Sequence, residues 1–297
     1  MERLLCLESG VVNRAYEDPV LLKDNRVLQN LLSTEDRYVP TTCYFKCVQK
    51  DIRPYMRKMV SDWMAEVCAE QNMEEEVFPL AMNYLDRFLC VQSIDRNRLQ
   101  CLGAACMFLA SKLKETYPIM AEQLVMYTDN SITQSDLRDM ESQILHVLRW
   151  DLSAVTPHDF LVQITSRLPL DRAHVHTVKK HAQTFMALCA TDCKFMLFPP
   201  SMIAAGCIGA AIRGLLGSSY DGSLTERLHK ITGIEIDCLR GCQELIEQLV
   251  TSSLSSLNQS TSLDSKSDTM TEQATTPTDV RDINLAVVDE ENSHLLL

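Results

Sequence analysis

Apolar residues recur along most of this chain at intervals of three and four positions, the spacing of one face of an α-helix. No segment keeps the two-residue alternation of hydrophobic and polar positions that a half-buried strand requires. Proline and short polar runs separate the periodic segments. We therefore predict an all-α fold. The expected helices cover residues 21–33, 52–70, 75–91, 96–114, 119–128, 134–149, 157–167, 171–191, 199–214, 223–231 and 235–251.

After the first helix, the expected helices form two sets of five, divided at the Thr-Pro step before Pro157. The third helix of each set carries a run of small and apolar residues, at 102–105 and at 202–211. Small residues let a helix approach its neighbours closely, so each run is expected to lie in the central helix of a five-helix bundle.

These patterns divide the chain into four parts. We expect a flexible segment over residues 1–20, a first helical domain with its preceding helix over 21–152, and a second helical domain over 153–250. Residues 251–297 contain no Trp, Tyr or Phe and are dense in Ser, Thr and Asp. Such a segment cannot bury enough apolar surface to offset its ordering entropy, so we expect a disordered tail there.

Charge and composition exclude several classes of protein. A formal net charge of −12 argues against a nucleic-acid partner, because such proteins normally present a basic face. No apolar run approaches the roughly 20 residues of a membrane span, and no secretory signal is visible, so no membrane partner is expected.

The 12 cysteines favour neither a disulfide framework nor a metal site. Pairs such as Cys43 and Cys47 have helical spacing, and no CxxC pair is completed by a second one or by paired histidines. We expect free thiols that pack as small hydrophobic groups, with no metal and no cofactor. No nucleophile–base arrangement or phosphate-binding loop is present in the sequence, so it does not predict an enzyme.

Two charged residues fall on apolar helical stripes. Lys112 follows Phe108 by four positions, and Glu141 interrupts the stripe of Leu137 and Ile144. A charge on a packed face is costly unless it is paired or meets a partner. The spacing leaves three alternatives open: a structural Lys112–Glu141 ion pair, a lysine whose stem is buried while its charged end reaches water, or a contact with another protein.

Another helical stripe contains Met56, Val60, Trp63 and Val67. Its 4-3-4 spacing alone is typical of a core-facing side, and we prefer that interpretation for Val67.

Several motifs resemble known sequences. Residues 56–67, 84–89 and 110–115 resemble three segments of the cyclin box in the same order, and residues 158–160 and 198–201 are similar to the C-terminal cyclin fold. Near the termini, residues 4–8 and 276–283 resemble the D-type subfamily of G1/S-specific cyclins. The resemblance implies two tandem five-helix cyclin folds. It also implies a regulatory subunit, not itself an enzyme, that binds and activates cyclin-dependent kinases four and six.

The same resemblance implies roles for particular residues. Lys112 and Glu141 stand where the family carries a lysine and a glutamate that contact backbone groups around the kinase's mobile C-helix. Arg57 is expected to be structural. A surface groove is implied that docks short basic-hydrophobic motifs of substrates or of Cip/Kip-type kinase inhibitors. Its expected residues are Met56, Val60, Trp63, Glu66 and Gln100, with Val60 replacing the leucine common in other cyclins.

The two ends of the chain carry further implied sites. Leu4, Cys6 and Glu8 form the L-x-C-x-E pattern recognised by the pocket of retinoblastoma-family proteins. Thr276 precedes a proline and is a candidate for phosphorylation, which would create a site for a ubiquitin ligase adaptor. The implied function is to direct phosphorylation of retinoblastoma-family proteins and promote the G1/S transition, in the nucleus and cytoplasm. A transcription factor that binds nucleic acid is the competing class, disfavoured by the acidic charge and the lack of a zinc ribbon.

Overall fold

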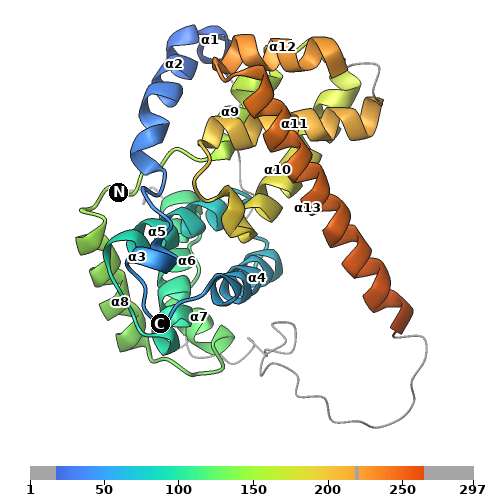
Figure 1. The fold of residues 1–297 in the computed structure, drawn as a ribbon. Helices are drawn as coiled ribbons and strands as arrows, with labels where there is room; N and C mark the ends of the chain where they lie inside the picture. The colour runs from blue at the N-terminus through green and yellow to red at the C-terminus, as the bar shows by residue number, and fades with distance from the viewer. Residues whose placement is uncertain (1–17, 218–220, 264–297) are drawn as a thin grey trace, which may run out of the picture.

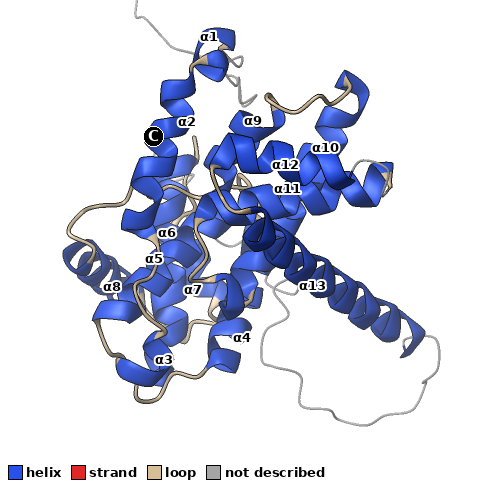
Figure 2. Ribbon diagram, turned by 45° about the horizontal axis from the view of Figure 1, so that its top comes forward, coloured by secondary structure: helices blue, strands red, loops and turns tan. Residues whose placement is uncertain are grey.

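The computed structural model describes residues 18–217 and 221–263. The predicted sites at Leu4, Cys6, Glu8 and Thr276 lie outside the described residues. Within them the regular elements are helices, without a strand (Figure 2), which confirms the all-α prediction. The leading elements are α1 (Pro19–Lys23), α2 (Asn25–Thr34), η1 (Glu35–Tyr38) and α3 (Tyr44–Cys47).

Two sets of helices follow and form two bundles, the first below the second in Figure 1. The first set comprises α4 (Pro54–Glu70), α5 (Val77–Val91), α6 (Leu99–Lys114), α7 (Ala121–Tyr127) and α8 (Gln134–Val147), with η2 (Arg96–Arg98) before α6. The second comprises α9 (Pro157–Thr165), α10 (Arg172–Thr191), α11 (Pro200–Leu216), α12 (Asp221–Thr232) and α13 (Ile236–Leu263), with η3 (Cys193–Phe195) before α11.

The third helix of each set is its central helix, as the small-residue runs predict. Helix α6 packs against α4, α5, α7 and α8, and α11 packs against α9, α10, α12 and α13. Glycines make these contacts close. A Cβ atom on Gly103 would lie 2.8 Å from Val60 Cγ1, and one on Gly206 would lie 2.7 Å from Ile246 Cδ1. A larger residue at either position would force these neighbouring side chains to shift.

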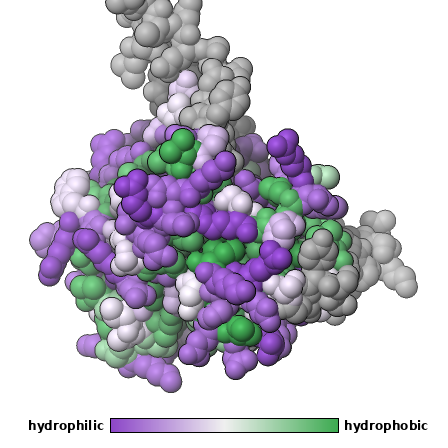
Figure 3. Space-filling model, turned by 90° about the horizontal axis from the view of Figure 1, so that it is seen from above, coloured by the Kyte–Doolittle hydropathy of each residue, from purple (hydrophilic) through white to green (hydrophobic). Residues whose placement is uncertain are grey.

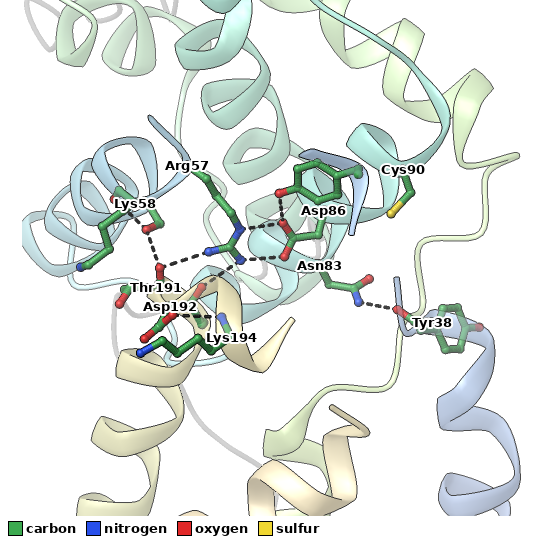
Figure 4. A network of polar contacts seen from close by, with 12 residues as sticks. Tyr38, Arg57, Lys58, Asn83, Asp86, Cys90, Thr191, Asp192 and Lys194 are labelled. Atoms are coloured by element: carbon green, nitrogen blue, oxygen red, sulfur yellow. Dashed lines mark hydrogen bonds and ion pairs between the residues drawn. The ribbon is translucent and has the colours of Figure 1, made fainter. Parts of the chain in front are cut away.

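A buried ion pair joins the two bundles (Figure 4). Arg57 on α4 donates from Nε and Nη2 to the carboxylate of Asp86 on α5, at 2.8 and 2.7 Å, and both side chains are nearly inaccessible to solvent. The same guanidinium donates to the carbonyl oxygens of Ala190 and Thr191 at the end of α10, each at 3.1 Å. The Tyr44 hydroxyl donates to Asp86 at 2.8 Å. The prediction that Arg57 is structural fits this arrangement.

A second buried carboxylate fixes the N-terminal helices to the second bundle. Glu35 in η1 accepts hydrogen bonds from the backbone N–H and the hydroxyl of Ser201, both at 2.7 Å, in the first turn of α11. Burial raises the pKa of Glu35, and the two hydrogen bonds from Ser201 partly oppose that rise. A carboxylate at this position also satisfies orphan N–H groups at the start of α11.

Two predicted boundaries are corrected by the structure. The helix expected over 21–33 is divided at Asp24, which ends α1 and whose carboxylate accepts from Arg26 N–H to cap α2. Helix α13 runs to Leu263 and extends away from the bundles (Figures 1 and 2), although a disordered tail was expected from residue 251. Hydroxyls of Thr251 and Ser255 donate to carbonyls one turn earlier, so these polar side chains are satisfied within the helix.

The described cysteines carry free thiols. Burial raises the pKa of Cys68 and of Cys242 to about 12, so these thiols pack as neutral, weakly polar groups. The buried members are Cys68, Cys101 and Cys106 in the first bundle, and Cys189, Cys207 and Cys242 in the second.

The surface seen from above mixes small hydrophobic areas with hydrophilic residues (Figure 3). Among the helices of the described chain, none combines the length and the apolar character needed to cross a membrane.

The Arg57–Asp86 pair gives a stability prediction. Arg57→Met should lower the free energy of unfolding by about 3–5 kcal/mol, because it leaves the Asp86 carboxylate buried without its partner. Lys58, the next residue on α4, is half exposed and paired with Asp62, so Lys58→Ala should change stability by only about 0.5 kcal/mol. Urea unfolding followed by circular dichroism measures both variants. Similar losses in the two variants would contradict the structural importance of the buried pair.

A buried histidine gives a pH prediction. His158 in the first turn of α9 is buried, and neither ring nitrogen has a hydrogen-bond partner. Burial lowers the pKa of His158 from 6.5 to about 4, with Glu76 and Lys114 acting in opposite directions. Between these values the unfolded chain binds more protons than the folded chain, so stability falls as the pH is lowered.

We expect His158→Phe to weaken this pH dependence. Between pH 7 and pH 5 the variant should lose about 2 kcal/mol less unfolding free energy than the wild type. Urea titrations of both chains at the two pH values provide the measurement. Parallel losses would show that the His158 imidazole is not kept neutral by the fold.

Candidate partner-binding surfaces

Lys112 and Glu141 meet at the surface where α6 packs against α8. Lys112 lies in the last turn of α6, and its Nζ is 2.7 Å from Oε1 of Glu141 in α8. The Lys112 side chain is 42% exposed and the Glu141 side chain 15%. The Lys112 ammonium also lies 3.6 Å from the ring centroid of Phe108, one turn earlier. The ammonium group itself therefore lies over the aromatic face, while it is paired with Glu141 and remains partly exposed to solvent.

This geometry settles part of the sequence-based question. The ion pair predicted as one alternative is present, and Lys112 is only partly covered, because the residue lies in the last turn of α6. An ammonium group has three donors and a carboxylate several acceptor sites. The Lys112–Glu141 hydrogen bond uses one of each, so both side chains keep capacity for backbone groups of a partner.

Large apolar side chains are exposed near the ends of the same two helices. Leu113, which follows Lys112, is 46% exposed, and Trp150, just beyond the end of α8, is 73% exposed. Arg149 and Trp150 have φ values of 54° and 60°, a left-handed conformation that is uncommon for such residues. We call Lys112, Leu113, Glu141 and Trp150 the Lys112 face. Leu113 and Trp150 were not predicted from the sequence to belong to a binding surface, since periodicity cannot distinguish an exposed tryptophan from a core one.

The second candidate surface lies along α4. Met56, Val60 and Trp63 are half-buried, while Val67 is fully buried, as preferred for Val67 from the sequence. The Trp63 indole N–H donates to the carbonyl of Tyr127 at 3.2 Å, which holds the ring against the end of α7.

The opposite wall of this surface comes from the start of α6. The close contact between Gly103 and Val60 brings α6 against α4, and the half-buried Gln100 lies one turn before Gly103. Glu66 is exposed on α4. We call Met56, Val60, Trp63, Glu66 and Gln100 the α4 surface.

The two candidate surfaces lie at opposite ends of one helix. Gln100 is in the first turn of α6 and Lys112 in the last, about 18 Å apart along the helix axis. A partner at one end therefore leaves the other end accessible.

Comparisons with known proteins agree with this architecture. Residues 26–153 match the N-terminal cyclin domain and residues 155–279 match the C-terminal cyclin domain. A viral cyclin from herpesvirus saimiri has the same fold, with a TM-score of 0.68 and 25% identity, covering 76% of this chain and 97% of that one.

Sequence relatives share most of the chain. It is 57% identical over 289 residues to G1/S-specific cyclin-D2 of Xenopus laevis, covering 95% of this chain and 99% of that protein. It is 53% identical over 292 residues to G1/S-specific cyclin-D3 of Homo sapiens, covering 96% and 100%. Two tandem cyclin folds and this identity across nearly the whole length show that the chain belongs to the D-type cyclins, the G1/S-specific, non-catalytic regulatory subunits of cyclin-dependent kinases.

Proposed function

We propose that this chain binds and activates cyclin-dependent kinases four and six through the Lys112 face. The observation that carries the proposal is an accessible Lys112–Glu141 ion pair together with two exposed apolar side chains, Leu113 next to Lys112 on α6 and Trp150 just beyond the end of α8. Charged groups with spare hydrogen-bonding capacity next to exposed apolar residues are typical of a protein-binding site.

The chemistry of the pair suits a helix end of the kinase. The Lys112 ammonium donates to backbone carbonyls, and the Glu141 carboxylate accepts from backbone N–H groups around the mobile C-helix. The two side chains turn from each other to the kinase as the ion pair opens. An inward C-helix then completes the lysine–glutamate pair of the kinase active site.

Apolar contacts supply the area that such an interface needs. Leu113 and Trp150 lose solvent exposure when the kinase binds, and an aromatic anchor of this kind often dominates the binding energy. The Lys112–Glu141 pair fixes the orientation of the bound kinase, and the apolar contacts of Leu113 and Trp150 supply affinity.

We further propose that the α4 surface docks basic-hydrophobic motifs of substrates and of Cip/Kip-type inhibitors. Met56, Val60 and Trp63 offer half-buried apolar contacts, and Gln100 offers an amide for the peptide backbone. Glu66 is exposed and negative, which favours a basic residue in the bound peptide.

The N-terminal motif is proposed to bind the pocket of retinoblastoma-family proteins directly. An extended segment held by main-chain hydrogen bonds would place Leu4 and Cys6 in pockets and Glu8 against backbone donors. Direct binding measured without kinase tests this role. Equal affinity of the wild type and a Cys6→Ala/Glu8→Ala chain would remove the motif from the interaction. In this proposal the kinase phosphorylates the retinoblastoma-family protein held by the motif, and that phosphorylation promotes the G1/S transition.

Thr276 is proposed to control lifetime and location. A phosphate on Thr276 adds negative charge and acceptor oxygens that a ubiquitin ligase adaptor can recognise, and shifts the protein between nucleus and cytoplasm. Pulse-chase labelling tests this proposal. The same half-life for wild type and Thr276→Ala would count against it.

The Lys112 face gives the first binding prediction. Lys112→Glu should abolish kinase binding, because it removes the donor and places a second negative charge beside Glu141. Lys114→Glu is a matched control, since Lys114 is two residues away on α6 and is paired with Glu76 instead. Pull-down of kinases four and six measures both variants, with circular dichroism as the check on folding. Wild-type affinity in a folded Lys112→Glu chain would refute the proposed face.

The two tryptophans of the chain give a reciprocal prediction. Trp63→Ala should preserve kinase binding and weaken docking at the α4 surface by about 2 kcal/mol, because a large apolar contact is lost. Trp150→Ala should weaken kinase binding and preserve docking at the α4 surface. Binding of the kinase and of an inhibitor's docking peptide is titrated against each variant. Loss of both activities in one folded variant would show that the two surfaces are not independent.

A further inference from the structure

An apolar groove in the second bundle has no assigned role. It runs between the start of α11 and the first half of α13 and has a volume of about 560 Å³, within the roughly 300–1,000 Å³ of ligand sites. Phe198, Pro199 and Met202 form one wall, and Cys238, Gly241 and Leu245 form the other. We call these six residues, with Cys242, Glu244 and Gln248 of the same lining, the α13 groove.

The groove is open and its walls are accessible. Leu245 is 37% exposed, and Leu197, beside Phe198, is 44% exposed. Cys238 is exposed, whereas Cys242 below it is buried against α11. Apolar side chains that line an open hollow are a common feature of sites that receive side chains of another segment.

Gly241 is the unusual residue of this groove. It lies inside α13, where glycine lowers helix stability relative to alanine. Gly103, Gly206 and Gly209 are explained by close contacts, but a Cβ atom on Gly241 would meet no atom within 4 Å. The described chain therefore gives Gly241 no packing reason. A bare backbone at an apolar groove leaves room for an approaching ligand.

The charges around the groove select the kind of ligand. Glu244 and Gln248 lie both in the α13 groove and in a shallower hollow that continues along α13 and includes Glu247. Neither lining contains Lys or Arg. The neighbouring cations are engaged: Arg240 with Asp237, and Arg213 with Glu247. Because Glu247 is paired with Arg213, Glu244 is the carboxylate of these linings that places negative charge beside the apolar floor, and it complements an apolar segment with a basic flank.

We propose that the α13 groove docks a linear segment of a partner protein, in which apolar anchor residues are flanked by Lys or Arg. The anchors fill the hollow over Gly241, between Phe198 and Leu245, and the basic residues lie against Glu244. The chain's own residues 264–297 fit less well, because their carboxylates outnumber their cations. This docking site lies in the second bundle and is separate from the Lys112 face and the α4 surface.

The test begins with selection on the full chain. A phage library of random nonapeptides is first depleted on the Gly241→Leu variant, which removes sequences that bind elsewhere, and is then selected on the wild type. The proposal expects enrichment of apolar residues flanked by Lys or Arg. Recovery of no enriched sequence, or of sequences without basic residues, would overturn it.

The affinity of the selected peptide is then measured by fluorescence anisotropy. Gly241→Leu places a large side chain on a lining residue whose Cβ position is open, and Glu244→Lys reverses the charge beside the groove, so each should weaken binding by about tenfold or more. Gly214→Leu is the matched control, because Gly214 is an exposed helical glycine on α11 that also meets no atom within 4 Å and lies outside the groove. The Gly214→Leu and Trp63→Ala variants should bind as the wild type does.

Two further outcomes would overturn the proposal and identify another binding site or another occupant. Equal binding by wild type and Gly241→Leu, with loss in Trp63→Ala, would place the peptide on the α4 surface and overturn the groove. Displacement of the peptide by a synthetic segment of residues 264–297 would identify the chain's own tail as the occupant, and would overturn the proposal of a separate partner. Kinase binding by Gly241→Leu should stay unchanged throughout, so this test does not depend on the Lys112 face.

Discussion

The Arg57–Asp86 ion pair is the interaction on which the arrangement of this molecule depends. It joins α4 to α5, and through the carbonyls of Ala190 and Thr191 it joins the first bundle to the end of α10 in the second. A buried guanidinium is costly to desolvate, so its N–H groups need hydrogen-bond partners on both α5 and α10. This requirement couples the position of the second bundle to the rotation of α4. The same rotation sets which residues of α4 face outward, including Met56, Val60 and Trp63.

Central helices of small residues are the second constraint. Because Gly103 brings α4 onto α6, the two walls of the α4 surface meet at a contact that a larger residue could make only if Val60 and Met64 shifted. The equivalent contact in the second bundle is made by Gly206 against α13, one wall of the α13 groove. Each bundle thus holds its peripheral helices at a separation set by its own central helix. The shapes of the α4 surface and of the α13 groove therefore depend on how closely those helices pack.

Periodicity predicted most of the helices because burial of one helical face is a local property of the sequence. It placed Met56, Val60, Trp63 and Val67 on one stripe, and only the resemblance to cyclins separated the outer three from the buried Val67. It could not foresee that Arg57 would meet carbonyls more than a hundred positions away, since that contact depends on how two bundles dock. The expected helix over 96–114 already placed Lys112 in a last turn, but spacing alone does not show how much of its side chain the neighbouring helices leave exposed. The extension of α13 to Leu263 was missed because a change in composition does not locate the residue at which a helix ends.

The buried cysteines have a consequence for how this protein reacts with oxidants. Three buried thiols belong to each bundle, and a thiol reacts as thiolate only when an agent can reach it. Their modification therefore has to wait for local or global opening, whereas the exposed Cys43, Cys47 and Cys238 react directly. Loss of buried thiols with time measures how often each bundle opens. The rates at which the three buried cysteines of each bundle are modified therefore report the opening of the first bundle and of the second bundle separately.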